Sequence, residues 1–183
     1  MSSSMVHETM KHFLRAEQFA VIGRVMTDRS RWDNKILNWY RDRGLPVLGV
    51  RPNKPPADGI EGLGLLTDID QIPDLSQTSI SIIIHPSVGL PLLKRLYPLP
   101  LTSASSSGAS TNSSKGTETT PNEPRNVWFQ PGADDAAIWE YVKERGIQDK
   151  VIGHGACVYR DGDALLQEMK DELEADGKGQ SRL

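Results

Sequence analysis

Short apolar runs alternate with amphipathic stretches along most of the 183-residue chain. Brief runs rich in Val, Ile and Phe are typical of strands that are buried on both faces of a parallel sheet. The predicted strands are 18–23, 45–53, 79–86, 125–132 and 150–159. Apolar residues three and four positions apart predict helices at 33–43, 87–99, 134–146 and 163–174, and a short helical turn at 65–72.

This order of elements predicts the fold class. Strands that alternate with helices through short connections favour an α/β fold, a Rossmann-like three-layer sandwich with a mainly parallel, five-stranded sheet. Ligands of such sheets bind at the edge where the strands end. The predicted binding edge is therefore formed by the end of the strand 150–159 and by the turns after Gly23, Val50, Ile84 and Phe129.

The chain divides into a predicted domain and three less regular parts. Residues 18–166 form the predicted Rossmann-like domain, with a leader or helix at 1–17 and a charged tail at 167–183. The segment 102–124 is dominated by Ser, Thr, Gly, Asn and Pro, without an apolar period. We expect this insert to be disordered, because it cannot bury enough apolar surface to offset its ordering entropy. Since it joins a helix to a strand, it should lie opposite the predicted binding turns.

Composition narrows the choice of partners. The net charge is −3, the sequence pI is about 5.8, and no basic stripe is present, which argues against nucleic acid or an anionic membrane as main partner. No apolar run approaches the roughly 18 residues of a membrane helix. The first residues lack the apolar core of a signal peptide, and a single cysteine rules out a disulfide within the chain. We therefore expect a cytoplasmic protein with a small-molecule ligand.

The first predicted turn offers donors for a phosphate. Gly23 ends an apolar strand, and about nine residues separate it from a helix that starts near Asp33. Successive backbone N–H groups and a helix N-terminus can hold a diphosphate. The candidate ligand-binding residues here are Gly23, Arg24, Val25, Arg29 and Asn34, with Arg31 as a further cation and Trp32 as a surface on which adenine could stack. The alternative is a plain strand-to-helix turn.

The second turn carries cations where an NAD site would carry an acid. An NAD-binding sheet usually ends its second strand with a carboxylate that accepts from the ribose hydroxyls. Here the strand ends in Arg51, Pro52, Asn53 and Lys54, with no carboxylate before Asp58. This pattern favours a nucleotide whose ribose carries a phosphate, either NADP or coenzyme A.

The third and fourth turns each pair a polar side chain with a proline, as His85–Pro86 and as Gln130–Pro131–Gly132. Proline stiffens the wall of a crevice because its ring fixes the backbone. Gln130 can donate to and accept from an amide, as the pantetheine arm of coenzyme A would require. The alternative for Gln130 is a hydrogen bond that caps the sheet edge.

Four sequence blocks resemble a known family. They read FAVIG…NKILNWYRDRGLPVLGVRPN, SISIIIHP, VWFQPG and GACVYRDGD, and their order and spacing are similar to those of the CoA-binding domain family. These are stand-alone Rossmann-like proteins, similar to the N-terminal CoA-binding domain of the succinyl-CoA synthetase α subunit. The resemblance covers nearly all of the chain outside the leader, the 102–124 insert and the tail.

The resemblance implies a role for each turn and also points to a departure. It implies that Gly23 holds the diphosphate and that Asn53 and Lys54 lie by the adenosine and its 3′-phosphate. It also implies that His85 and Pro86 flank the nucleotide crevice and that Gln130, Pro131 and Gly132 line the pantetheine side. Family members usually carry small residues where this chain has Arg24, Val25, Met26 and Asp33. A carboxylate in the first helical turn competes with an anionic ligand for the same N–H groups. The departure therefore predicts weakened or lost ligand binding.

Cys157, at the end of the last predicted strand, has two interpretations. It is either a small buried hydrophobe or a thiol close enough to a bound CoA sulfur to form a mixed disulfide. Neither zinc nor serine-type catalysis fits, because His85, His154 and Cys157 lack zinc-ligand spacing and the sequence has no nucleophile elbow.

Three functions remain open. The first is a single-domain protein that binds coenzyme A or an acyl-CoA without evident catalysis, as a carrier, sensor or regulator. The second is an NADP-linked oxidoreductase or redox sensor, against which stands the absence of a Tyr-x-x-x-Lys pair. The third is a degenerate Rossmann scaffold that has lost its ligand and serves an unidentified protein partner.

Overall fold

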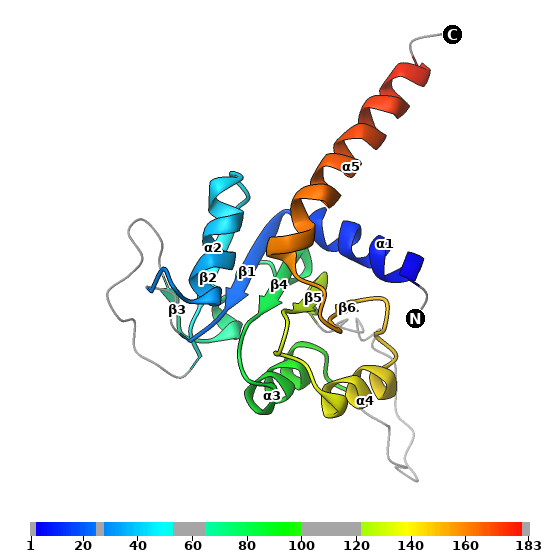
Figure 1. The fold of residues 1–183 in the computed structure, drawn as a ribbon. Helices are drawn as coiled ribbons and strands as arrows, with labels where there is room; N and C mark the ends of the chain where they lie inside the picture. The colour runs from blue at the N-terminus through cyan, green and yellow to red at the C-terminus, as the bar shows by residue number, and fades with distance from the viewer. Residues whose placement is uncertain (1–2, 25–27, 53–64, 100–121, 181–183) are drawn as a thin grey trace, which may run out of the picture.

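The fold is built around a parallel sheet with helices on both faces (Figure 1). The structure is a computed structural model, and it describes residues 3–24, 28–52, 65–99 and 122–180. Within these residues six strands pair in the order β3-β2-β1-β4-β5-β6, each parallel to its neighbours. The prediction of an α/β fold with a parallel sheet is confirmed, and the strand order is that of the Rossmann-like doubly wound sheet.

The elements have the following bounds. The strands are β1 Gln18–Ile22, β2 Val47–Val50, β3 Leu65–Leu66, β4 Thr78–Ile82, β5 Asn126–Phe129 and β6 Val151–Ile152. The α-helices are α1 Ser3–Leu14, α2 Trp32–Asp42, α3 Pro86–Leu96, α4 Ala136–Arg145 and α5 Val158–Gln180. Two short 3-10 helices, η1 Ile69–Gln71 and η2 Leu75–Gln77, lie between β3 and β4.

The sheet has one strand more than the sequence predicts. The pattern predicts a helical turn over 65–72, but Leu65 and Leu66 pair in parallel with Gly49 and Val50 of β2. Only the later part of that stretch is helical, as η1. The prediction of five strands was wrong because a two-residue strand is too short to leave a periodic pattern.

β6 ends after two residues, at Ile152, although the sequence predicts a strand over 150–159. His154 and Gly155 have φ angles of 55° and 83°, which lie in the left-handed region and cannot continue a strand. The predicted position of Cys157 at the end of a strand is therefore wrong, since it lies in the turn that leads into α5.

Apolar cores lie on both faces of the sheet. Alternate residues of β1 point to opposite sides, so that Ala20 and Ile22 pack with α3 and α4, whereas Phe19 and Val21 pack with α1, α2 and α5. All four residues are at most 1% exposed. The uninterrupted apolar run at this point of the sequence reflects burial on both faces.

α5 starts earlier and ends later than the predicted helix at 163–174, and Figure 1 shows its C-terminal part running away from the sheet. Ion pairs connect the middle of α5 to α1. Lys11 Nζ lies 2.7 Å from Glu172 Oε1 and 3.2 Å from Glu168 Oε1, and the Lys11 side chain is 6% exposed. Hydrogen bonds to Glu172 and Glu8 raise the pKa of Lys11, which keeps this cation charged.

The flanks of the predicted insert 102–124 are joined by Arg145 of α4. The structure describes only the last three residues of the insert. Arg145 Nε donates to Pro98 O at 2.7 Å on one side, and Arg145 Nη2 donates to Glu123 Oε1 at 2.5 Å on the other. These contacts lie at the amino edge of the sheet, before β5 begins. Glu123 is thus bonded to the domain.

We expect deletion of residues 103–121, with a short Gly-Ser bridge in their place, to change the melting temperature by less than about 2 °C. Arg145 already holds the two flanks together, so closing a shorter loop costs little. Thermal unfolding followed by circular dichroism measures the effect, with Glu123→Ala as a control that should cost more because it breaks this link. A fall of more than about 5 °C on deletion would contradict the prediction.

Candidate ligand-binding site

The carboxyl ends of β1, β4 and β5 lie side by side at the centre of the sheet. Their first loop residues are tied by backbone hydrogen bonds: Ile83 N donates to Ile22 O at 2.9 Å, and Gln130 N donates to Ile82 O at 3.0 Å. The strand order reverses between β1 and β4, and ligands of doubly wound sheets bind outside the strand ends at such a point. The turns that follow β1, β2, β4 and β5 all open onto this edge or flank it.

The first turn is closed by a carboxylate from α2. Asp33 Oδ2 accepts a hydrogen bond from Arg24 N at 2.9 Å, and Asp33 is 3% exposed. A methyl group at Gly23 would lie 2.5 Å from Asp33 Cβ, so only glycine lets the carboxylate come this close. The Arg24 N–H group, which the sequence offers to a ligand phosphate, therefore already donates to an anion.

Of the other predicted residues of the first turn, Asn34 lies in α2, and Arg24 and Arg29 lie in the loop before it. Arg24 and Arg29 are exposed, Asn34 is buried, and Val25 lies outside the described residues. Asn34 Oδ1 accepts from Asn38 Nδ2 at 2.9 Å. Asn34 and Arg29 contribute to a polar groove of about 600 Å³ between α2 and α5.

At the second turn, backbone pairing fixes the end of β2. Arg51 N donates to Leu66 O of β3 at 2.8 Å. Arg51 is half-buried, and its Nε atom has no hydrogen-bond partner among the described residues. Pro52 is half-buried beside it, while Asn53 and Lys54 lie outside the described residues.

The third turn uses its histidine as a helix cap. His85 Nδ1 accepts a hydrogen bond from Ser87 N at 3.3 Å and lies 2.8 Å from Ser87 Oγ. Pro86 is buried at the first position of α3, where proline costs no backbone hydrogen bond. His85 is exposed at the edge. The start of α3 therefore explains both residues without a ligand.

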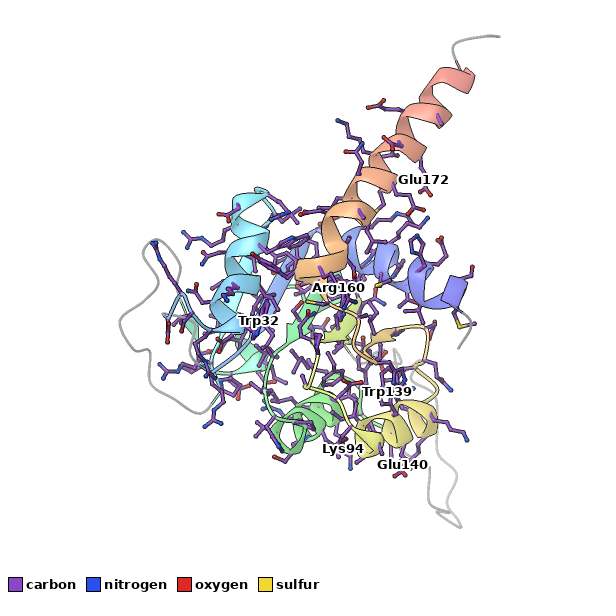
Figure 2. All side chains as sticks on the ribbon, in the orientation of Figure 1. Trp32, Lys94, Trp139, Glu140, Arg160 and Glu172 are labelled. Carbon is purple, nitrogen blue, oxygen red and sulfur yellow. The ribbon has the colours of Figure 1, made fainter. Side chains whose placement is uncertain are left out.

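A cavity of about 360 Å³ opens at the end of β5, between α2 and α5; we call it the β5–α5 cavity. Its lining residues are Trp32, Ile36, Ile83, Gln130, Pro131, Cys157, Tyr159 and Arg160. Figure 2 shows Trp32 at the start of α2 and Arg160 at the start of α5. The structure thus brings together four of the predicted residues, Trp32, Gln130, Pro131 and Cys157. Among the described residues, nine predicted ones do not line this cavity: Gly23, Arg24, Arg29, Asn34, Arg51, Pro52, His85, Pro86 and Gly132.

Gln130 has one paired and one unpaired amide atom. The residue is 2% exposed, and its Oε1 accepts from Val158 N, the first residue of α5, at 3.0 Å. This bond fixes the orientation of the amide. Gln130 Nε2 has no hydrogen-bond partner within the described part of the chain. Burying such a donor unpaired costs about 1–3 kcal/mol, so the donor points to a ligand that carries an acceptor.

The sequence did not point to four of the lining residues, Ile36, Ile83, Tyr159 and Arg160. Tyr159 falls in the predicted strand 150–159 and Arg160 directly after it, which hid their place at the start of a helix. The signal that could have revealed them is the Gly-His-Gly run at 153–155, because glycines on both sides of a polar residue favour a turn over a strand.

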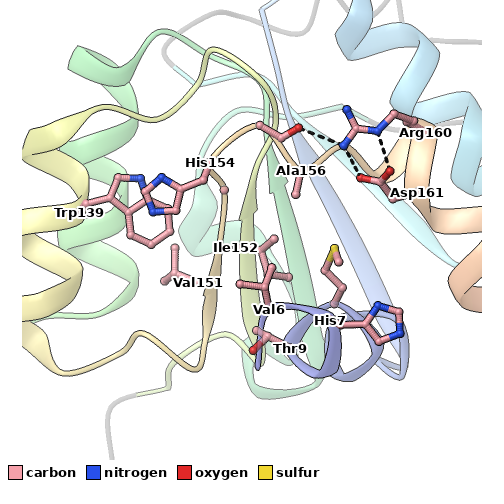
Figure 3. Close-up of a pocket in the computed structure, with 13 residues that line it drawn as sticks. Val6, His7, Thr9, Trp139, Val151, Ile152, His154, Ala156, Arg160 and Asp161 are labelled. Atoms are coloured by element: carbon pink, nitrogen blue, oxygen red, sulfur yellow. Dashed lines mark hydrogen bonds and ion pairs between the residues drawn. The ribbon is translucent and has the colours of Figure 1, made fainter. Parts of the chain in front are cut away.

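A second cavity, of about 470 Å³, lies beside β6 between α1 and α4 (Figure 3). On one wall His154 stacks on Trp139, with ring centroids 3.9 Å apart and planes at 13°. Asp134 Oδ2 accepts from Trp139 Nε1 at 2.8 Å and from His154 N at 2.9 Å. On the other wall Arg160 Nε pairs with Asp161 Oδ1 at 2.6 Å. These polar groups bond to one another, which leaves them less available to a ligand.

A metal-binding cluster and a membrane-spanning helix are both absent from the part of the chain that the structure describes. None of its His, Cys, Asp and Glu side chains form a group of three or more that could hold a metal ion. None of its helices combines the length and the apolar character needed to cross a membrane.

A family model described as a CoA binding domain matches residues 17–104. This segment belongs to the CoA-binding domain family. The CoA-binding domain match includes the turns of Gly23, Arg51 and His85, which form the first three parts of the edge. β5, Gln130 and α5 lie beyond the matched segment. No curated protein matches the chain.

Solved structures resemble most of the chain. The match to the structure of cell-free ID.343 from Thermus thermophilus covers 87% of this chain and 98% of that chain, with a TM-score of 0.62 and 18% identity. A hypothetical protein from Pyrococcus horikoshii OT3 matches with a TM-score of 0.62, and Prb, a PH1109 protein redesigned for binding, with 0.60. Both are 15% identical, over 88% of this chain and 92% of the other. At such identities the likeness shows the fold alone.

Proposed function

We propose that this protein binds coenzyme A, or an acyl thioester of it, along the carboxyl edge of its sheet, and that it does so without catalysis of its own. The observation that carries the proposal is that Gln130 lines the β5–α5 cavity and has a buried, unpaired Nε2 donor, at the same edge as the turns of a CoA-binding domain. A donor buried in an apolar cavity suits a ligand that is largely apolar there and carries an amide carbonyl. The pantetheine arm has this chemistry.

Charge along the edge supports an elongated ligand that is anionic at one end. Arg51 follows β2, and Arg24 and Arg29 follow β1, whereas the walls of the β5–α5 cavity are mostly aromatic and aliphatic. From β2 to β5 the edge crosses three inter-strand spacings, about 14 Å. In this proposal the diphosphate lies near the arginines and the 3′-phosphate near Asn53 and Lys54. The arm then runs past the end of β4 to Gln130.

One observation favours a second candidate, a Rossmann scaffold that has lost its ligand. Asp33 occupies the Arg24 N–H group and adds a negative charge where the diphosphate would lie. Helix N-termini favour anions, and the first turn of α2 already holds one of its own. CoA binding at this edge requires that the remaining contacts outweigh this repulsion.

Thermal unfolding in the presence of CoA, acetyl-CoA, 3′-dephospho-CoA and NADP separates these candidates. A ligand at 100 times its Kd stabilises by about 2.7 kcal/mol, which raises the melting temperature of a domain of this size by about 5–10 °C. We expect such a shift with CoA and acetyl-CoA and a smaller one with 3′-dephospho-CoA, which lacks the phosphate assigned to Asn53 and Lys54. A shift with NADP alone would favour an oxidoreductase, and no shift with any compound would favour the scaffold. Either result overturns the proposal.

A further inference from the structure

The β5–α5 cavity is lined by a thiol as well as by Gln130, whose buried Nε2 donor has no partner among the described residues. Cys157 is half-buried and lines the cavity together with Gln130 and Pro131. It is the only cysteine in the sequence, so any thiol chemistry of this chain takes place here. Two independent features, a thiol and a buried amide donor, therefore meet in a cavity with apolar walls.

The backbone holds Cys157 in a fixed position at the start of α5. Its N–H donates to Asp161 Oδ2 at 2.9 Å, and its carbonyl accepts from Asp161 N at 2.8 Å and from Arg160 N at 3.1 Å. Gln130 Oε1 holds the next N–H group, that of Val158, at 3.0 Å. The same glutamine thus anchors the turn that carries the thiol, and its Nε2 donor has no hydrogen-bond partner among the described residues.

Aromatic and aliphatic side chains form most of the cavity lining. Trp32 and Tyr159 meet edge to face across it, with ring centroids 5.8 Å apart, and both rings are about half exposed, at 56% and 47%. Ile36 and Ile83 complete the apolar lining. In coenzyme A two methylene groups separate the sulfur from the nearest amide. An arm whose carbonyl accepts from Gln130 Nε2 would therefore bring its sulfur into the apolar part of the cavity that Cys157 lines.

We propose that Cys157 exchanges with a disulfide of coenzyme A and so holds CoA covalently, an inference that rests on the proposed CoA binding. The co-reactant is a disulfide CoA–S–S–R, symmetrical or mixed. The Cys157 thiolate attacks the CoA sulfur, a new Sγ–S bond forms, the old S–S bond breaks, and R–S⁻ leaves and is protonated. Cys157 is oxidised to a disulfide while the R sulfur is reduced to a thiol, so electrons balance. A second thiol reverses the step.

The test measures adduct formation on the reduced, full-length protein by intact mass. We expect symmetrical CoA disulfide to give one CoA adduct per chain, removed by dithiothreitol, at a rate that saturates with concentration. At equal concentration it should react at least about tenfold faster than glutathione disulfide or pantethine, because only CoA disulfide carries the nucleotide that the edge binds. No adduct, or equal rates for all three disulfides, would overturn the inference.

Two variants separate this inference from the proposed function. Cys157→Ser should form no adduct but keep the thermal shift with CoA. If it keeps that shift while the wild-type protein shows no selective adduct, the inference fails and the proposed function stands; if CoA shifts neither protein, both fail. Gln130→Glu keeps the Oε1 acceptor of Val158 N and removes the Nε2 donor, so it should slow the reaction with CoA disulfide about tenfold more than the reaction with cystamine, which needs no amide donor. An equal loss with both disulfides would mean that Gln130 only supports the turn, which contradicts its part in orienting CoA.

Discussion

Replacing Asp33 by serine is expected to raise the affinity for CoA at least about tenfold. The Asp33 carboxylate accepts from Arg24 N at 2.9 Å and is buried in the first turn of α2, where a ligand diphosphate would receive its backbone donors. Two like charges 5 Å apart repel by about 3 kcal/mol at an effective dielectric constant of 20. A tenfold gain needs only about 1.4 kcal/mol, so partial screening still leaves room for it.

Isothermal titration calorimetry with CoA measures this effect, and Asp28→Ser is the matched control. Asp28 is exposed in the same loop, where its Oδ1 accepts from Ser30 N at 2.8 Å, and its replacement changes the net charge by the same amount. We expect the control to change the affinity less than about twofold, since an exposed charge is screened by salt. If both variants bind equally, or if Asp33→Ser binds CoA more weakly, Asp33 does not compete with the ligand.

Replacing Gly162 by alanine is expected to destabilise the protein by about 1–3 kcal/mol. The opposite sign would be expected for an ordinary helical glycine, since alanine favours a helix by about 1 kcal/mol. Gly162 is buried in α5 against Trp39 of α2, and an added methyl group would contact the ring, with Cη2 at 2.7 Å. The ring cannot move aside, because it is 2% exposed and packs under Arg43 at 4.3 Å and edge-on to Tyr40 at 5.0 Å.

Urea unfolding gives the free-energy change, and the double variant Gly162→Ala/Trp39→Phe is the control. The smaller phenylalanine ring removes the atoms that the new methyl group would meet, so the alanine should cost less in that background, by at least about 1 kcal/mol. The close approach of α5 to α2 at Gly162 also sets the distance between Tyr159 and Trp32 across the β5–α5 cavity. Additive effects, or a stabilising alanine, would show that the two helices are not packed this tightly.

Elements with a strong apolar period were predictable from the sequence, and short ones were not. β1 and β4 are runs buried on both faces, and α4 begins at an acidic cap and ends at Gly146 in the left-handed region. β3 has only two residues and forms because it pairs with the open edge of β2, a contact that depends on the tertiary structure. The end of β6 was missed because β-branched and aromatic residues favour a strand locally, while the left-handed turn at His154 overrides them.

Sequence by itself determined the order of five of the six strands and of their turns, and hence that Gln130 and Pro131 would reach the carboxyl edge of a parallel sheet. It could do so because the hydrophobic period and the handedness of crossovers are local or general rules. Only the tertiary structure decided which side chains share a cavity, as Trp32 and Tyr159 do, and which polar atoms are already paired. Burial and hydrogen-bond geometry depend on segments far apart in the chain, so no local pattern records them.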